Sequence, residues 1–127
     1  MRIIKKKLIK IGFTKITNYE QLVNLGFPTL FTFKSDNQTY IGFTNQYKPS
    51  YGIIEFILAT TNKQKIKDYM TNKITANQFF KSSNTNQYNF TKGKLTLKKI
   101  DDEKLKNVIP SEALTYDNPF NTIYEEK

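Results

Sequence analysis

Two groups of charged residues lie close enough along the chain to act together, and the first is basic. It comprises five lysines that all precede the first acidic residue, Glu20: Lys5, Lys6, Lys7, Lys10 and Lys15. Lysines that no neighbouring acid neutralises form a candidate binding site for an anion. A solvated basic arm without a partner has the same sequence pattern, so both interpretations stay open.

The second group is acidic and consists of Asp101, Asp102 and Glu103, with Glu55 elsewhere in the chain. Grouped carboxylates can hold Mg²⁺ for phosphodiester cleavage. Adjacent carboxylates in front of a helical segment are more often helix caps, and Glu103 is followed by Lys104 in a predicted helix rather than in a strand. We therefore expect a helix start here, with a Mg-dependent nuclease or toxin as an alternative.

Several residue types that catalysis commonly needs are missing. The chain has no cysteine and no histidine, which excludes thiolate nucleophiles, disulfides and imidazole acid–base chemistry. Its five glycines are isolated, so no phosphate-binding glycine loop is present. We expect a protein that is not an enzyme and that carries no cofactor and no metal.

A second candidate binding site is the segment that holds Tyr47, Lys48 and Tyr51. Pro49 and Gly52 predict that residues 45–52 form a loop. Binding residues concentrate in loops, so the two tyrosines are candidates for exposed contacts.

Charge is unevenly distributed along the chain. Residues 1–99 hold 17 of the 20 basic and 4 of the 11 acidic side chains, and the net charge of the whole chain is +9. A basic body commonly meets nucleic acid, an anionic membrane surface or an acidic protein, although lysines can also serve solubility alone. We expect no membrane partner and a cytoplasmic location, because neither a signal peptide nor a run of about 20 apolar residues is present.

The elements that must position these groups begin with an ambiguous segment. Ile4, Leu8 and Ile11 recur at helical spacing, but residues 8–16 are rich in β-branched types, and we expect a strand there. Thr17 and Glu20 have the spacing of a capping box, which predicts a short helix over residues 19–25.

The clearest signal is a β-hairpin over residues 29–34 and 39–44, with a polar turn between its strands. Phe31 and Phe33 share one face of the first strand, which predicts that they are buried rather than displayed for stacking. A nearly continuous apolar run predicts a central strand over residues 53–60.

The second half of the chain mixes helices with a further hairpin. Helices are expected over residues 62–72, through Ile66, Tyr69 and Met70, and over residues 76–81. A surface loop is expected over residues 82–87, followed by a hairpin over residues 88–91 and 94–100. A last helix should end before Pro110, and residues 117–127 should form a frayed acidic tail.

Together these elements predict one α+β domain over residues 1–127, with residues 1–16 as a basic amino-terminal segment. The expected architecture is a small antiparallel sheet led by a β-hairpin, with two or three short helices packed on one side.

From Phe27 to Tyr116, three segments in order resemble a family of small uncharacterised proteins from bacterial mobile elements and phages. They are Pro28-Thr29-Leu30-Phe31-Thr32-Phe33 followed by Thr39-Tyr40-Ile41, and Ile74-Thr75-Ala76-Asn77-Gln78-Phe79-Phe80. The resemblance implies a hairpin-led sheet with helices on one side and no transferable catalytic residues.

We therefore expect a binding protein, of the type that blocks host defence by occupying a nuclease or its nucleic acid. Its basic surface would engage nucleic acid or a nucleoprotein complex of the host. The alternative is a protein–protein interaction module whose charge is incidental, with an acidic protein surface as its partner.

Overall fold

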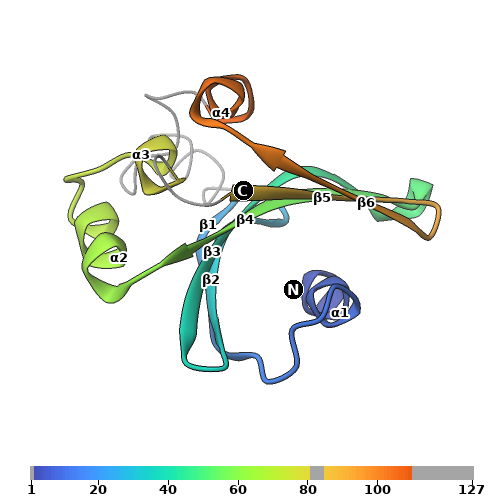
Figure 1. Ribbon diagram of the computed structural model, residues 1–127, viewed down its shortest axis with the longest axis horizontal. Coiled ribbons are helices and arrows are strands. Elements are labelled where there is room, and N and C mark those ends of the chain that lie inside the picture. The colour runs from blue at the N-terminus through green and yellow to red at the C-terminus, as the bar shows by residue number, and fades with distance from the viewer. Residues whose placement is uncertain (1, 81–84, 110–127) are drawn as a thin grey trace.

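Six antiparallel strands form a single sheet in the order in which they occur along the chain (Figure 1). The computed structural model describes residues 2–80 and 85–109. The strands are β1 (Thr17–Asn24), β2 (Pro28–Ser35), β3 (Gln38–Lys48), β4 (Ile53–Thr61), β5 (Thr85–Thr91) and β6 (Lys94–Ile100). A short 3-10 turn, η1 (Pro49–Tyr51), joins β3 to β4.

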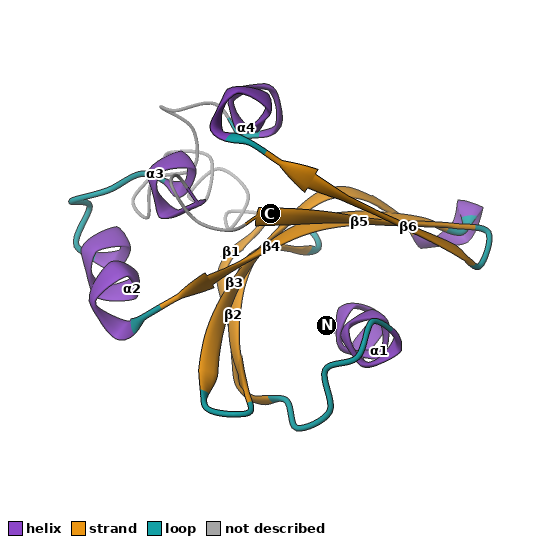
Figure 2. Cartoon of the chain, viewed as in Figure 1, coloured by secondary structure: helices purple, strands orange, loops and turns teal. Residues whose placement is uncertain are grey.

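Helices cover both faces of this sheet (Figure 2). Among the described residues, the amino-terminal helix α1 (Arg2–Lys10) is the helix on one face, and α2 (Lys63–Met70), α3 (Ala76–Phe80) and α4 (Asp102–Val108) lie on the other. The predicted α+β fold, a hairpin-led antiparallel sheet with two or three short helices on one side, is therefore confirmed. The helix α1 adds a cover for the second face.

Both hairpins close through two-residue turns. Asp36 and Asn37 have φ angles of 49° and 67°, and Lys92 and Gly93 have φ angles of 49° and 84°. Positive φ at both central residues is the turn geometry that matches the right-handed twist of paired strands. Asp36, Asn37 and Gly93 are of the types that adopt it at low cost, which favours the turns at these positions, whereas Lys92 adopts positive φ without that preference.

Two hydrophobic cores lie on opposite faces of the sheet. On the α1 face, Ile4 and Leu8 pack against the phenylalanines of β2 and β4, including Phe31, Phe33 and Phe56, and all five side chains are buried. On the other face, the core is formed by the apolar side chains of β3 and β4 with those of the three helices: Ile41, Ile57, Ala59, Tyr69, Phe79, Phe80 and Leu105. The expected burial of Phe31 and Phe33 is thus confirmed.

The strand predicted for residues 8–16 is wrong, because residues 2–10 form α1 instead. The helix is terminated at Gly12, whose φ of 117° is left-handed. The N–H of Gly12 donates to the carbonyl of Ile9 and that of Phe13 to the carbonyl of Leu8, which is the hydrogen-bond pattern of a Schellman cap. Burial of Ile4 and Leu8 outweighs the strand preference of the β-branched residues.

The helix predicted for residues 19–25 is also wrong, because this segment belongs to strand β1. Val23 is buried in the core, and Glu20 pairs with Thr32 across the sheet. A capping box satisfies only two N–H groups, whereas pairing with β2 provides partners along the whole segment.

Two boundaries and one predicted packing contact also differ from expectation. Strand β3 extends through Lys48, so half of the expected 45–52 loop is strand, and β5 begins at Thr85 within the expected 82–87 loop. Met70 is 39% exposed rather than packed on the sheet. The expected tail at residues 117–127 lies outside the described residues.

Candidate functional site

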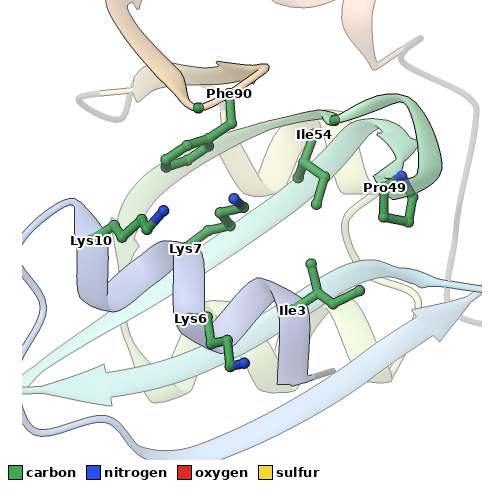
Figure 3. A pocket seen from close by; sticks show the side chains of 9 residues that line it. Ile3, Lys6, Lys7, Lys10, Pro49, Ile54 and Phe90 are labelled. Atoms are coloured by element: carbon green, nitrogen blue, oxygen red, sulfur yellow. The ribbon is translucent and has the colours of Figure 1, made fainter.

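A pocket with a volume of about 310 Å³ lies between α1 and the sheet, at the end where β4 begins and β5 ends (Figure 3). The residues of α1 that line it are Ile3, Lys6, Lys7 and Lys10. Lys10 lies three positions from Lys7 and four from Lys6, so it shares a side of the helix with each of them. The consecutive Lys6 and Lys7 point in different directions, and Lys7 is the one that points toward Phe90 and Ile54 (Figure 3). The buried Ile4 and Leu8 hold α1 against the sheet.

The opposite side of the pocket comes from two chain turns and two strands. Pro49 and Gly52 belong to the turn between β3 and β4, and Gly93 belongs to the turn between β5 and β6. The carbonyl of Gly52 accepts a hydrogen bond of 2.8 Å from the N–H of Lys92, which ties the two turns together. The floor is apolar because Ile54 and Phe90, which are paired across β4 and β5, both point toward α1.

Lys7 lies over the apolar floor of the pocket (Figure 3). Its ammonium nitrogen lies 4.8 Å from the ring centre of Phe90, within the range of a cation–π contact. Burial, and secondarily the charge of Lys10, lowers the pKa of Lys7 below its usual value. A compensating anion at this place would therefore be favourable.

The residues that line this pocket include three lysines and no acidic side chain. Three cations at one rim attract an anion, and the apolar floor favours a ligand that also has an apolar part. The arrangement suits an organic anion rather than an inorganic ion alone.

The sequence-predicted lysines are divided by the structure. Lys6, Lys7 and Lys10 all line the pocket, whereas Lys5 is an exposed residue of α1 that does not line it. Lys15 lies in a separate shallow depression with Lys34 and residues of the first hairpin turn.

The predicted loop residues also have different environments. Tyr47 is half-buried and stacks on Phe27, with ring centres 5.2 Å apart. Tyr51 is 71% exposed in η1, next to the pocket residues Pro49 and Gly52, and Lys48 is exposed. Tyr51 and Lys48 are therefore both exposed, and Tyr51 lies between the pocket residues Pro49 and Gly52 in the chain.

Sequence reasoning did not identify Ile3, Ile54, Phe90 or Gly93 as members of a site. The i, i+4, i+7 spacing of Ile3, Lys7 and Lys10 was a usable signal for one side of a helix. The sheet residues gave no comparable signal, because Ile54 and Phe90 are 36 positions apart in the chain and meet only through strand pairing.

The acidic group forms a helix start. The carboxylate of Asp101 accepts a hydrogen bond of 2.8 Å from the N–H of Lys104, as an N-cap of α4 does. Glu55 is buried on β4, where the side-chain amides of Asn45 and Asn89 both donate to its carboxylate. Within residues 2–80 and 85–109, no three acidic side chains gather in a way that could hold a metal ion.

A larger depression of about 630 Å³ lies between α2 and the ends of β1, β2 and β3. Its lining combines Lys34, Lys63 and Lys67 with the acidic Glu20 and the exposed Met70. The charge of its lining is therefore mixed, whereas the described lining of the α1 pocket includes lysines and no acidic side chain.

None of the helices in the described part of the chain is long and apolar enough to cross a membrane. Comparison of the chain with protein-family models, with curated proteins and with solved structures finds no match.

Proposed function

We propose that this protein is a non-enzymatic binding protein whose α1 lysines engage nucleic acid or a nucleoprotein complex. The observation that carries the proposal is that Lys6, Lys7 and Lys10 all line one pocket, whose lining includes no acidic side chain among the described residues. Phosphate groups are the anions that lysine clusters commonly bind, and they repeat along a nucleic acid strand at a spacing that several cations can use together.

The experiment measures binding to short DNA and RNA as a function of salt. Each lysine that neutralises a phosphate contributes roughly 0.9 to the slope of log affinity against log salt on duplex DNA, or roughly 0.7 on a single strand. Changing Lys6, Lys7 and Lys10 together to Gln should therefore reduce the slope by about two to three units.

The matched control changes three exposed lysines outside both the pocket and α1, Lys73, Lys98 and Lys104, to Gln. It removes the same charge, so a general attraction between a basic protein and a polyanion would fall equally in both variants. A slope that decreases as much in the control as in the pocket variant contradicts the proposal, and so does an absence of any salt-dependent binding.

A narrower version of the proposal is supported by the resemblance to small phage and mobile-element proteins. In this version the protein inhibits a host defence nuclease by occupying its nucleic acid or the nucleoprotein complex. Inhibition of DNA cleavage by a restriction endonuclease should then decrease in the Lys6, Lys7 and Lys10 variant and persist in the control variant. Equal inhibition of cleavage by both variants would show that the inhibition does not depend on the lysines of the pocket.

An exposed apolar pair on β6 favours the protein–protein alternative. Leu95 and Leu97 are 42% and 60% exposed, and among the described residues no strand pairs with the outer edge of β6. Such edges can add a strand from another protein, although the lysines beside these leucines also discourage uncontrolled pairing. Binding to an acidic protein that is lost on changing Leu95 and Leu97 to Thr, with nucleic acid affinity absent, would favour this alternative.

A further inference from the structure

The α1 pocket combines two features that a single nucleotide also combines. One end is apolar, where Ile54 and Phe90 are each 3% exposed, and the rim is cationic. A nucleobase is flat and largely apolar on its faces, and it is linked to a phosphate that carries charge. The pocket therefore matches one nucleotide better than it matches a bare phosphate or a wholly apolar ligand.

The volume of the pocket limits what can enter it. About 310 Å³ lies at the lower end of the range for small-ligand sites. A base that is paired within a duplex stays stacked between its neighbours, so it cannot enter a pocket of this size, whereas an unpaired base can turn outward. The size thus favours a single strand or a free nucleotide over a double helix.

Bare backbone at the rim allows a ligand to approach closely. Gly52 and Gly93 have φ angles of 70° and 84°, and a β-carbon at Gly93 would have no atom within 4 Å. Glycine leaves room at such positions, where another residue would place a side chain and strain the backbone. These two turns frame the pocket opposite the lysines of α1.

The ring of Phe90 identifies the place for the base. The Lys7 ammonium now lies over that ring, at 4.8 Å from its centre, and the long lysine side chain can turn away. A base that replaces the ammonium would stack on the aromatic ring, and the released ammonium would meet the phosphate. After this exchange the Phe90 ring is in contact with the base, and the Lys7 ammonium is in contact with the phosphate.

We infer that the α1 pocket binds one unpaired nucleotide, with its base against Phe90 and Ile54 and its phosphate at Lys6, Lys7 and Lys10. The inference rests on the proposed function, and it specifies that the nucleic acid is single-stranded at this site. The same chemistry is offered by a free mononucleotide, so the experiment must distinguish these two sources.

The test compares base-bearing with abasic ligands of equal charge on the wild-type protein, and a single strand with a duplex. A five-residue thymidylate strand is measured against a five-residue abasic strand and against a fully paired duplex that is long enough to stay hybridised. Thymidine monophosphate is measured against deoxyribose phosphate. The base-bearing strand should bind about tenfold more tightly than the abasic strand, as expected for one stacked base. It should also bind more tightly than the duplex.

The possible results separate the two hypotheses. Equal affinity for the thymidylate and abasic strands overturns the nucleotide inference while leaving phosphate-driven binding intact. Absence of binding to all strands contradicts the proposed function, and binding of the mononucleotide without the strands then identifies a free nucleotide as the ligand. The inference of a single-stranded ligand is supported if the thymidylate strand binds more tightly than the abasic strand and thymidine monophosphate binds more tightly than the sugar phosphate.

A pair of variants tests the position of the base. Ile3→Trp fills the pocket from α1, and Ile9→Trp makes the same change at a position of that helix that is 55% exposed and outside the pocket. The first variant should lose the tenfold preference for base-bearing strands, and the second should keep it. Retention of the preference in a folded Ile3→Trp variant contradicts this pocket as the base site, and the wild-type comparison stands even if that variant does not fold.

Discussion

The ring of Phe31 lies directly against Gly42, its pairing partner across strands β2 and β3. A β-carbon at Gly42 would overlap three atoms of that ring, Cζ, Cε1 and Cε2. Phe31 is fully buried and is surrounded by other rings, including Phe33 and Phe56, so it has little freedom to move away.

We predict that Gly42→Ala destabilises the protein by about 2 kcal/mol or more, because the added methyl group overpacks a rigid core. The measurement is the free energy of unfolding from denaturant titration. Thr60→Ala, at an exposed position on the neighbouring strand β4, is the control and should change stability by less than about 0.5 kcal/mol. A Gly42→Ala variant as stable as the wild type would show that Phe31 can be displaced.

The hydroxyl group of Tyr19 is buried without a hydrogen-bond partner among the described residues. Its ring stacks on Phe31, with ring centres 5.6 Å apart, so the ring is used in packing while the hydroxyl is not paired. We predict that Tyr19→Phe stabilises the protein by about 1 kcal/mol at neutral pH, since it removes the cost of burying an unpaired hydroxyl.

The same variant should show a specific pH dependence. Burial, with a smaller contribution from Tyr47, raises the pKa of Tyr19 above its usual value of 10.0. The unfolded chain therefore loses this proton first, and wild-type stability decreases as pH rises above about 10. The advantage of Tyr19→Phe should widen there, whereas Tyr51→Phe, at an exposed position, should match the wild type at neutral pH.

Lys7 provides a second test of how a shifted pKa makes stability depend on pH, and here stability should increase rather than decrease as pH rises. Its pKa is lowered in the folded protein by burial and by Lys10, so the unfolded chain binds the proton more tightly. The stability of the wild type relative to Lys7→Met should therefore increase as pH rises toward 10.5, the usual lysine value. Melting temperatures of the two proteins between pH 7 and 10.5 measure the difference.

The contribution of Lys10 to this trend can be isolated. When both proteins also carry Lys10→Gln, the stability difference that Lys7→Met causes should depend less on pH, because the neighbouring charge is gone. A difference that is constant with pH, with or without Lys10→Gln, would contradict the assigned environment of Lys7.

Asp101 is predicted to serve the stability of α4 rather than catalysis. Asp101→Ala should lower the free energy of unfolding by about 1 kcal/mol through loss of the N-cap, and Asp101→Asn should restore most of it. Changing Asp101, Asp102 and Glu103 together to Ala should leave nucleic acid binding unchanged. If the wild type cleaves nucleic acid with Mg²⁺ and the triple variant does not, the nuclease alternative replaces the proposed function.

Elements that depend on local chemistry were predictable from the sequence. The Asp36-Asn37 and Lys92-Gly93 turns need residues that tolerate positive φ, and the alternating or continuous apolar patterns around them predicted both hairpins and the central strand β4. Helix α2 followed from its 3.6-residue period and begins after Asn62, whose side chain accepts from the N–H of Lys65. The fold class, and the concentration of five lysines before Glu20, were therefore determined by the sequence.

The tertiary structure decided the states of the first 24 residues and the composition of the pocket. Residues 8–16 and 19–25 carry conflicting local signals, and α1 and β1 result because Ile4, Leu8 and Val23 are buried only in those conformations on this sheet. Phe90 reaches the α1 lysines only because β5 pairs with β4, a contact between segments far apart in the chain. Local propensity is worth tenths of a kcal/mol per residue, whereas burial of one large apolar side chain is worth about 1.5 to 3 kcal/mol, so packing determines the structure wherever the two disagree.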